Sequence, residues 1–195
     1  MKTPAHPRIA LPALAALALL AGCSTTEPVA PAPPAPAEPV ATSTAQEARV
    51  ALASASGSRV SGTLVLVPMD GGVHVRGQVG GLPANGQFGF HVHEKGDCSA
   101  ADATSTGSHF NPAGAPHGRA GSGAHHGGDM DNISSDAEGV ATVDAHLLGV
   151  TLGGGAANDI AGRAVIVHAD PDDYQSQPTG NAGARVACGV IKVVR

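Results

Sequence analysis

Two histidines with metal-ligand spacing are the residues of this sequence best suited to chemistry. His91 and His93 lie two positions apart in segment 88–93, where apolar and other residues alternate as in a strand. Side chains at positions i and i+2 of a strand share one face, so both imidazoles point the same way. Imidazole nitrogens are good ligands for copper and zinc. The pair therefore predicts part of a metal site.

Further candidate ligands lie downstream, in Gly-rich segments and at the end of an apolar segment. They are His109, His117, His126, Asp129 and His168. A carboxylate added to imidazoles suits zinc. A lone His is most often a surface residue, but so many in a few segments predict a metal centre. His125 adjoins His126, so either could be the ligand, whereas His74 and His146 sit in strand patterns and are expected to face solvent.

The segments around these residues have the pattern of an all-β fold. The chain has 27 Gly and 15 Pro but only 2% aromatic and 14% charged residues, which favours short strands and turns over a helical bundle. Strands are predicted at 60–67, 73–79, 88–93, 140–148, 164–168 and 186–194. Asp70-Gly71-Gly72 between the first two is a hairpin signal. Strands without helical spacers predict a sandwich or barrel.

Two long segments, 94–138 and 169–184, interrupt this series of strands. Both are much longer than a turn, and long ordered loops on a compact β scaffold commonly carry function. The first contains most of the candidate ligands, and the second follows directly after His168. We therefore expect two functional loops to build the site on the strands.

The N-terminal segment has the features of a bacterial lipoprotein signal peptide. Lys2 and Arg8 flank the start of an apolar run at 9–21, which is too short to span a bilayer comfortably. The run ends in Leu-Ala-Gly-Cys, which resembles a lipobox whose cysteine, Cys23, is acylated and becomes the mature N-terminus. The alternative is an ordinary secretory signal with a chance Cys. We expect removal of residues 1–22 and anchoring to the bacterial cell envelope, facing the periplasm or exposed at the surface.

A Pro-rich linker is expected at 23–48, behind the lipidated Cys23, with the folded domain at 49–195. Its prolines are Pro28, Pro31, Pro33, Pro34, Pro36 and Pro39. This composition favours extended polyproline II. About 25 residues at about 3.1 Å each reach at most roughly 75 Å, so the linker would act as a tether.

The charge of the chain excludes one class of partner. The formal net charge is −5 and becomes −7 once residues 1–22, with Lys2 and Arg8 and no acid, are removed. The chain has no basic stripe, so a nucleic-acid partner is not expected.

The cysteines fit an exported protein. The chain has 3 Cys, and if Cys23 carries lipid, Cys98 and Cys188 remain. They form either a disulfide, which an exported protein can keep, or two unpaired thiols.

Several motifs, taken in order, resemble the copper/zinc superoxide dismutase family, in its bacterial, secreted lipoprotein form. They are GFHVHEKGDC at 89–98, GSHFNPAGAPHG at 107–118, HGGD at 126–129, GRAVIVHADPDD at 162–173 and GNAGARVACGVI at 180–191. The resemblance covers about residues 59–195. It implies a Greek-key β-barrel of about eight antiparallel strands. It also implies dismutation of superoxide to dioxygen and hydrogen peroxide, by alternating reduction and oxidation of a copper ion.

The resemblance implies a site with two metals. The copper ligands would be His91, His93, His109 and His168, and the zinc ligands would be His109, His117, His126 and Asp129. His109 would bridge the metals as an imidazolate and deliver a proton to the forming peroxide. The family spacing His-x-x-Asp selects His126 over His125.

The resemblance also assigns roles to residues that bind no metal. Arg185 would attract the substrate anion and hydrogen-bond to it, the alternative being a mere surface charge. Asp172 would join a copper histidine to a zinc histidine, with Asp173 as the alternative. Cys98 and Cys188 would form the family disulfide.

Segment 174–178 departs from the family pattern. It lacks the charged residues that many eukaryotic members carry in their guidance loop. An acidic domain repels an anion at long range, so local positive potential must come from the metals, Arg185, and Lys95 or Arg119.

A second hypothesis is a non-catalytic copper/zinc-binding module, which would buffer or deliver metal. An adhesion sandwich would leave the histidine cluster without a role. The sequence leaves open whether the protein is a monomer or a homodimer.

The lipid anchor leads to a first prediction. We expect Cys23 to be acylated and to be the first residue of the mature chain, because stable anchoring needs two lipid signals and a multiply acylated Cys supplies them. Mass spectrometry of the mature N-terminus measures this. A soluble product cleaved elsewhere, with an unmodified or absent Cys23, would contradict it.

Overall fold

The structure is a computed structural model that describes residues 41–195. The predicted signal peptide, Cys23 and most of the predicted linker lie outside the described residues and stay predictions. Within 41–195, no helix is long and apolar enough to cross a membrane.

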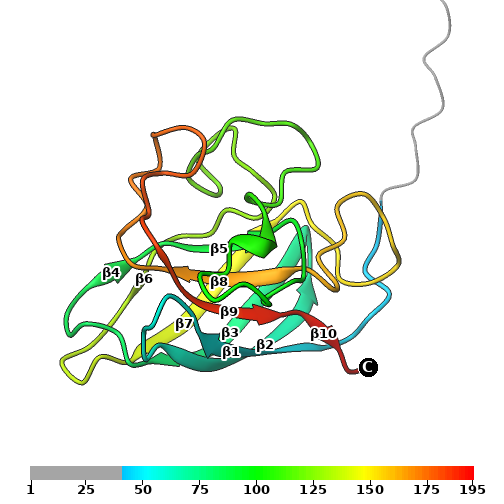
Figure 1. Cartoon of the computed structure of the whole chain (residues 1–195). Helices are drawn as coiled ribbons and strands as arrows, with labels where there is room; N and C mark the ends of the chain where they lie inside the picture. Colours follow the sequence, from blue (N-terminus) through cyan, green and yellow to red (C-terminus); the bar gives the residue numbers. More distant parts are fainter. Residues whose placement is uncertain (1–40) are drawn as a thin grey trace, which may run out of the picture. The chain divides into compact units, whose positions relative to one another are not determined.

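The described chain is almost entirely β-structure, as the sequence predicts (Figure 1). Its elements are β1 (Ala48–Ser54), β2 (Ser61–Met69), β3 (Gly72–Gly80), β4 (Gln87–Phe88), β5 (Phe90–His93), η1 (Thr104–Thr106), β6 (Ile133–Ser134), β7 (Ala141–Leu148), β8 (Ala164–His168), β9 (Arg185–Val190) and β10 (Lys192–Val193). Eight strands form one curled antiparallel sheet in the order β5-β8-β9-β1-β2-β3-β7, with β10 paired to β1, and β4 pairs with β6. The all-β fold class is confirmed.

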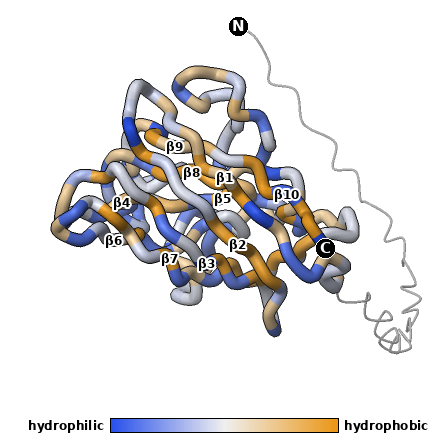
Figure 2. The backbone as a smooth tube through the Cα atoms, turned by 90° about the horizontal axis from the view of Figure 1, so that it is seen from below, coloured by the Kyte–Doolittle hydropathy of each residue, from blue (hydrophilic) through white to orange (hydrophobic). Residues whose placement is uncertain are grey.

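Strand β1 joins the two halves of the curled sheet. Its residues 48–52 pair with β2, and its residues 53–54 pair with β9. The core lies inside the curl: in β7 every second residue from Ala141 onward is buried, and the residues between them are exposed except for the half-buried Leu148. Figure 2 shows that hydrophobic residues lie along the strands. The period of two in the sequence thus fixes which face of each strand meets the core.

Strand β5 is buried on both faces. Phe90 and Val92 belong to the hydrophobic core, so the alternate residues His91 and His93 point to the opposite face. They are buried too, because the long loops after β5 and β8 lie over that face (Figure 1). The two functional loops that the sequence predicts therefore cover the histidine face of β5.

The loop after β5 is attached to that strand through the backbone of Val92. The Val92 N–H donates to the Gly128 carbonyl, and the Val92 carbonyl accepts from the Phe110 N–H, each at 2.8 Å. The Gly128 N–H then donates to the Phe110 carbonyl at 2.8 Å. Two passes of one loop are thereby held against β5, which brings His109 opposite His93 and Asp129 opposite His91 as β-bridge partners.

A β-bulge between β8 and β9 turns Arg185 toward the histidines. Val167 pairs with Ala187, but His168 pairs with Arg185, so the register shifts by one residue. Val186 and Ala187 both pack on the core side. Without the extra residue, Arg185 would share the core-facing side of Ala187, because side chains alternate along a strand.

Several element boundaries differ from the sequence prediction. The strand predicted at 88–93 breaks at Gly89, whose N–H donates to the Asp170 carbonyl. The strand predicted at 186–194 breaks at Ile191, whose N–H donates to the Arg163 carbonyl. Strands β1 and β6 and the long connection 149–163 were not predicted. The ordered chain also extends upstream of residue 49, since the Ala45 N–H donates to the Leu152 carbonyl.

The tight packing at Gly128 leads to a second prediction. A Cβ there would lie 2.2 Å from the Val92 carbonyl oxygen and 3.1 Å from the Phe110 backbone nitrogen. We expect Gly128→Ala to separate the loop from β5, to destabilise the protein by about 1–3 kcal/mol and to lower its metal content. Denaturant unfolding and metal analysis measure both.

Gly80→Ala is the matched control, because its Cβ would meet nothing closer than Val140 at 4.0 Å. Equal stability and metal content in the two variants would show that neither stability nor metal binding depends on the close packing of the loop against β5 at Gly128.

Candidate metal centre

The structure brings the predicted ligands into two buried clusters. One, the four-histidine cluster, consists of His91, His93, His109 and His168, and the other, the Asp129 cluster, consists of His109, His117, His126 and Asp129. In each cluster the possible ligand atoms lie within 4.8 Å of one another. His109 belongs to both, and its ring lies 4.0 Å from that of His91 between centroids.

The Asp172 carboxylate orients one ring of each cluster. His91 donates through Nε2 to Asp172 Oδ2 at 2.8 Å, and His117 donates through Nε2 to Asp172 Oδ1 at 2.9 Å. Nδ1 of both rings is left for the clusters. Asp173, the alternative, is exposed and bonds instead with Ser176 and Asn181.

Backbone carbonyls orient two further rings of the four-histidine cluster. His93 donates through Nδ1 to Gly107 at 3.0 Å, and His168 donates through Nδ1 to Gly183 at 3.2 Å. Their Nε2 atoms then face each other at 3.4 Å. With Nδ1 protonated, both Nε2 atoms carry lone pairs, and a cation between them would satisfy both.

The donor atoms of this site fit metal ions. His109 donates through Nδ1 to Asp129 Oδ1 at 2.8 Å, which leaves its Nε2 for the four-histidine cluster. Buried ring nitrogens without a hydrogen-bond partner in the described structure are His91 Nδ1, His109 Nε2 and His117 Nδ1. A buried polar atom without a partner costs about 1–3 kcal/mol. Ligation to a metal would remove that cost at each of them.

Burial keeps three rings of the four-histidine cluster, those of His93, His109 and His168, neutral at physiological pH. Burial, together with neighbouring imidazoles, lowers the pKa of His93 to about 2 and that of His168 to about 3. Burial lowers the pKa of His109 to about 4, although the hydrogen bond to Asp129 opposes the shift. A neutral imidazole is the form that binds metal.

The Asp129 cluster differs from the four-histidine cluster, because it carries a negative charge on Asp129. Burial alone raises the pKa of Asp129, but the close contacts of its carboxylate with the rings of His109, His117 and His126 hold it well below its usual range. Burial alone lowers the pKa of His117, but the nearby carboxylates of Asp129 and Asp172 raise it to about 9. The cluster therefore attracts positive charge, which a proton on His117 or a bound cation would supply.

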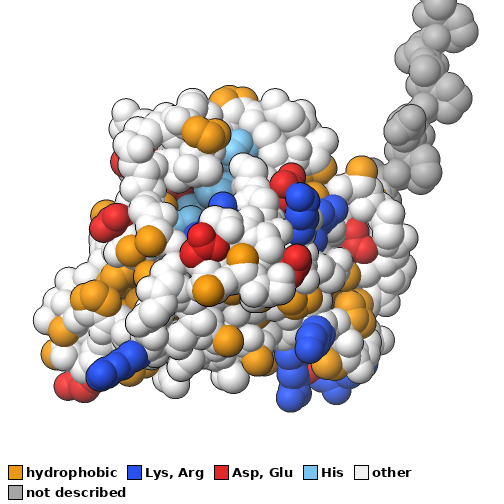
Figure 3. Space-filling view, viewed as in Figure 1, with side chains coloured by type: hydrophobic (Ala, Val, Ile, Leu, Met, Phe, Trp, Pro, Cys, Tyr) orange, Lys and Arg blue, Asp and Glu red, His pale blue; other side chains and the backbone are white. Residues whose placement is uncertain are grey.

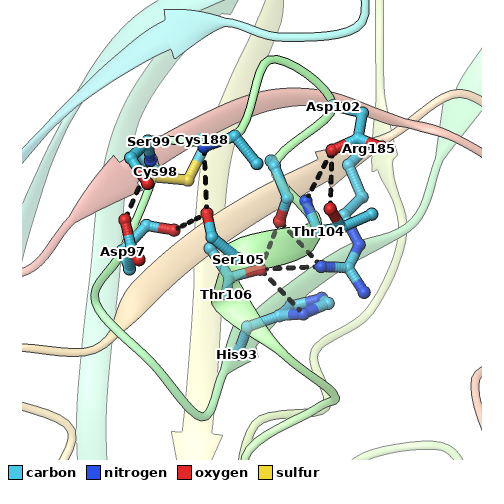
Figure 4. Close-up of a disulfide and its surroundings, with 12 residues drawn as sticks. His93, Asp97, Cys98, Ser99, Asp102, Thr104, Ser105, Thr106, Arg185 and Cys188 are labelled. Atoms are coloured by element: carbon cyan, nitrogen blue, oxygen red, sulfur yellow. Dashed lines mark hydrogen bonds between the residues drawn. A yellow bond between two sulfur atoms is a disulfide. The ribbon is translucent and has the colours of Figure 1, made fainter.

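Arg185 is held beside the four-histidine cluster by three acceptors, and Figure 4 shows one of them, Thr106, between Arg185 and His93. Its Nη1 donates to the Ala103 carbonyl and to Thr106 Oγ1, both at 2.8 Å, and its Nη2 donates to the Gly107 carbonyl at 2.7 Å. The Gly107 carbonyl also accepts from His93. The half-buried guanidinium is thus fixed by the same loop residues that orient a ligand, and it is not a free surface charge.

The predicted disulfide between Cys98 and Cys188 is present. It joins the loop that carries the Arg185 acceptors to β9, which carries Arg185 itself (Figure 4). The two cysteines are 90 residues apart. Closing so long a loop stabilises by about 4–5 kcal/mol in the chain-entropy model.

The other charges near the site differ from Arg185 in how they are placed. Arg119 bonds to Asp131 at 2.8 Å and lies over the Tyr174 ring, so its charge is largely compensated. The Asp102 carboxylate lies near enough to Arg185 to oppose the lowering of its pKa by burial. Figure 3 shows the histidines in a hollow with both acidic and basic side chains near its rim. Arg185 is the cation whose charge, in addition to burial, contributes to the lowered pKa of His93 and His168, whereas Lys95 is exposed on the loop after β5.

His74, His125 and His146 lie outside the two buried clusters, as the sequence predicts. His125 donates to the Gly123 carbonyl and belongs to neither buried cluster. His146 is exposed and His74 is half-buried, but the two rings stack beside Asp144 as a third possible metal-binding group. Sequence reasoning missed this group, as well as Thr106 and the Gly107 carbonyl. Only the pairing of β3 with β7 could have indicated the first.

Comparisons with known proteins give a consistent result. Residues 60–191 match the family model described as copper/zinc superoxide dismutase. Two superoxide dismutases of Aquifex aeolicus (strain VF5), Cu-Zn 2 and Cu-Zn 1, are 41% and 40% identical over 136 and 134 residues. These alignments cover 68% and 67% of this chain and 80% and 79% of the relatives.

Solved structures show the same similarity. The clock protein EA4 is 40% identical with a TM-score of 0.69, covering 79% of this chain and 98% of its own. A SOD-like protein from Bacillus subtilis is 34% identical with a TM-score of 0.67, covering 73% of this chain and 96% of its own.

The Asp129 cluster leads to a third prediction. We expect Asp129→Ala to lose zinc, to loosen the loop from Asn111 to Met130 and to lower the melting temperature, because it removes the carboxylate that contacts three histidine rings. Part of the activity should survive if copper is still loaded. Metal analysis and calorimetry measure these effects.

Asp131→Ala is the control, since it removes an exposed carboxylate two positions away whose ion pair is worth at most about 1 kcal/mol. Full zinc content and unchanged melting in Asp129→Ala would remove Asp129 from the ligand set.

Proposed function

This chain belongs to the copper/zinc superoxide dismutase family, and we propose that it is an active superoxide dismutase. The reaction converts two superoxide anions and two protons into dioxygen and hydrogen peroxide. One superoxide is oxidised and the other is reduced, so no further electron donor is needed. The observation that carries the proposal is the position of His109 between the two clusters.

Copper and zinc are the metals of this family, and both clusters can hold metal ions. We assign copper to the four-histidine cluster and zinc to the Asp129 cluster, because a carboxylate beside imidazoles suits zinc and an all-imidazole set suits copper. Copper supplies the one-electron redox chemistry when bound. Zinc has no redox chemistry, and its ligands would organise the loop that carries them.

The proposed work of the chain's own residues is to bind the anion and to move a proton. The Arg185 guanidinium attracts superoxide and donates hydrogen bonds to it. His109 Nε2, which is buried and has no hydrogen-bond partner, takes up a proton and delivers it to the forming peroxide. Asp172 keeps the neighbouring His91 and His117 rings in place, as carboxylates behind metal-bound histidines do.

The second candidate is a non-catalytic copper/zinc-binding module. It is favoured by the similarity to proteins named for other roles, a SOD-like protein and a clock protein. Retention of every predicted ligand and of Arg185 favours the dismutase. A superoxide consumption assay on copper- and zinc-loaded protein separates the two, because the module binds both metals without turnover.

We further propose that the enzyme acts at the bacterial cell envelope, anchored by lipid on Cys23. The lipobox-like end of the N-terminal apolar run and the Pro-rich segment behind it support this proposal. The disulfide fits an oxidising compartment outside the cytosol.

The position of Arg185 leads to a fourth prediction. We expect Arg185→Ala to lower the second-order rate about tenfold or more, equivalent to about 1.4 kcal/mol, with unchanged metal content. The rate of Arg185→Lys should lie between those of the wild type and Arg185→Ala, because lysine keeps the positive charge but lacks the planar, forked guanidinium. Pulse radiolysis measures these rates.

Arg59→Ala is the control, because it makes the same change in net charge at an exposed position. The wild-type rate should fall with added salt if local attraction by Arg185 dominates, and rise if the overall negative charge dominates. A wild-type rate in copper-loaded Arg185→Ala would exclude Arg185 from the site.

A further inference from the structure

We propose that His74, Asp144 and His146 form a third metal site, which binds one zinc or copper(II) ion on the outer face of the sheet. These residues share no member with the two buried clusters. Their possible ligand atoms lie within 4.8 Å of one another, as in each buried cluster. The site is separate from the proposed dismutase reaction.

The pairing of β3 with β7 places the two imidazoles side by side. His74 and His146 are direct cross-strand partners in the antiparallel register, and directly opposed side chains lie on the same face. Their rings stack at 4.6 Å between centroids with an interplanar angle of 19°. The register thus holds two imidazoles together at the surface, with ligand atoms close enough for side-chain rotation to bring them onto one ion.

Asp144 supplies a third donor on the same face. It lies two residues before His146 on β7, so both side chains point outward. Its direct cross-strand partner is Arg76, yet its Oδ1 contacts His74 Nε2 at 2.5 Å. The carboxylate is therefore already directed toward the imidazoles, although a cation lies opposite it.

The chemistry of this group suits a transition metal. Two imidazoles and a carboxylate favour zinc or copper(II) over magnesium or calcium, which prefer oxygen ligands. The side chains of His74 and Asp144 are 24% and 73% exposed, so they can rotate and water can complete the coordination. Met69 and Asp131 line the same surface pocket as Asp144 and His146, which adds a thioether and a carboxylate nearby.

The test uses protein already loaded with one copper and one zinc per chain. Zn²⁺ is titrated into it by calorimetry up to 1 mM, with Mg²⁺ as a negative probe. We expect one further Zn²⁺ per chain and no binding of Mg²⁺. His146→Gln and, separately, Asp144→Asn should weaken this third binding event at least tenfold, with the dismutase rate unchanged.

Thr142→Ala is the matched control, because Thr142 is exposed on the same face of β7 and lies outside the group. It should bind the third ion as tightly as the wild type. A parallel titration with Cu²⁺ should produce a second copper(II) electron paramagnetic resonance signal with nitrogen hyperfine structure, which His146→Gln loses.

Two results would overturn the proposal. One is loaded wild-type protein that binds no third Zn²⁺ or Cu²⁺ up to 1 mM. The other is a third ion that binds His146→Gln and Asp144→Asn as tightly as Thr142→Ala, which would place it elsewhere on the chain.

Discussion

The backbone of Val92 is the contact on which the metal centre depends. Its N–H and carbonyl hold two separate passes of the loop after β5, at Gly128 and Phe110. His109 precedes Phe110 and Asp129 follows Gly128 in the sequence. These backbone hydrogen bonds therefore set the distances between ligands that are far apart in the sequence. Because Val92 is itself buried in the core, the position of the loop is fixed relative to the packed sheet.

Four imidazoles at the centre, those of His91, His93, His117 and His168, are held by a hydrogen bond at one nitrogen and present the other nitrogen to the clusters. Asp172 and the carbonyls of Gly107 and Gly183 accept the fixed hydrogens. Burying unpaired polar atoms opposes folding, so the packing of the surrounding sheet has to offset this unfavourable free energy. In return, the rings lose little conformational freedom when a ligand binds, which is how a rigid scaffold favours tight and specific coordination.

Local patterns in the sequence predict much of this arrangement, and tertiary geometry decides the rest. The spacing of His91 and His93 predicts their common face from strand periodicity alone, and the motif resemblance supplies the partners that periodicity cannot join. The bulge that turns Arg185 toward His168 could not be predicted, because it appears only when β8 and β9 pair. The meeting of His74 with His146 depends on the register of strands 72 positions apart.

The shared His109 ring makes the two halves of the centre thermodynamically dependent on each other. Its Nδ1 faces the Asp129 cluster, and its Nε2 remains for the four-histidine cluster. Any ion that binds at one nitrogen changes the electron density and orientation that the other nitrogen offers. Linkage then requires that each occupant alter the affinity for the other by the same factor, whichever arrives first. Order of loading can therefore change the pathway of assembly but not the stability of the fully loaded protein.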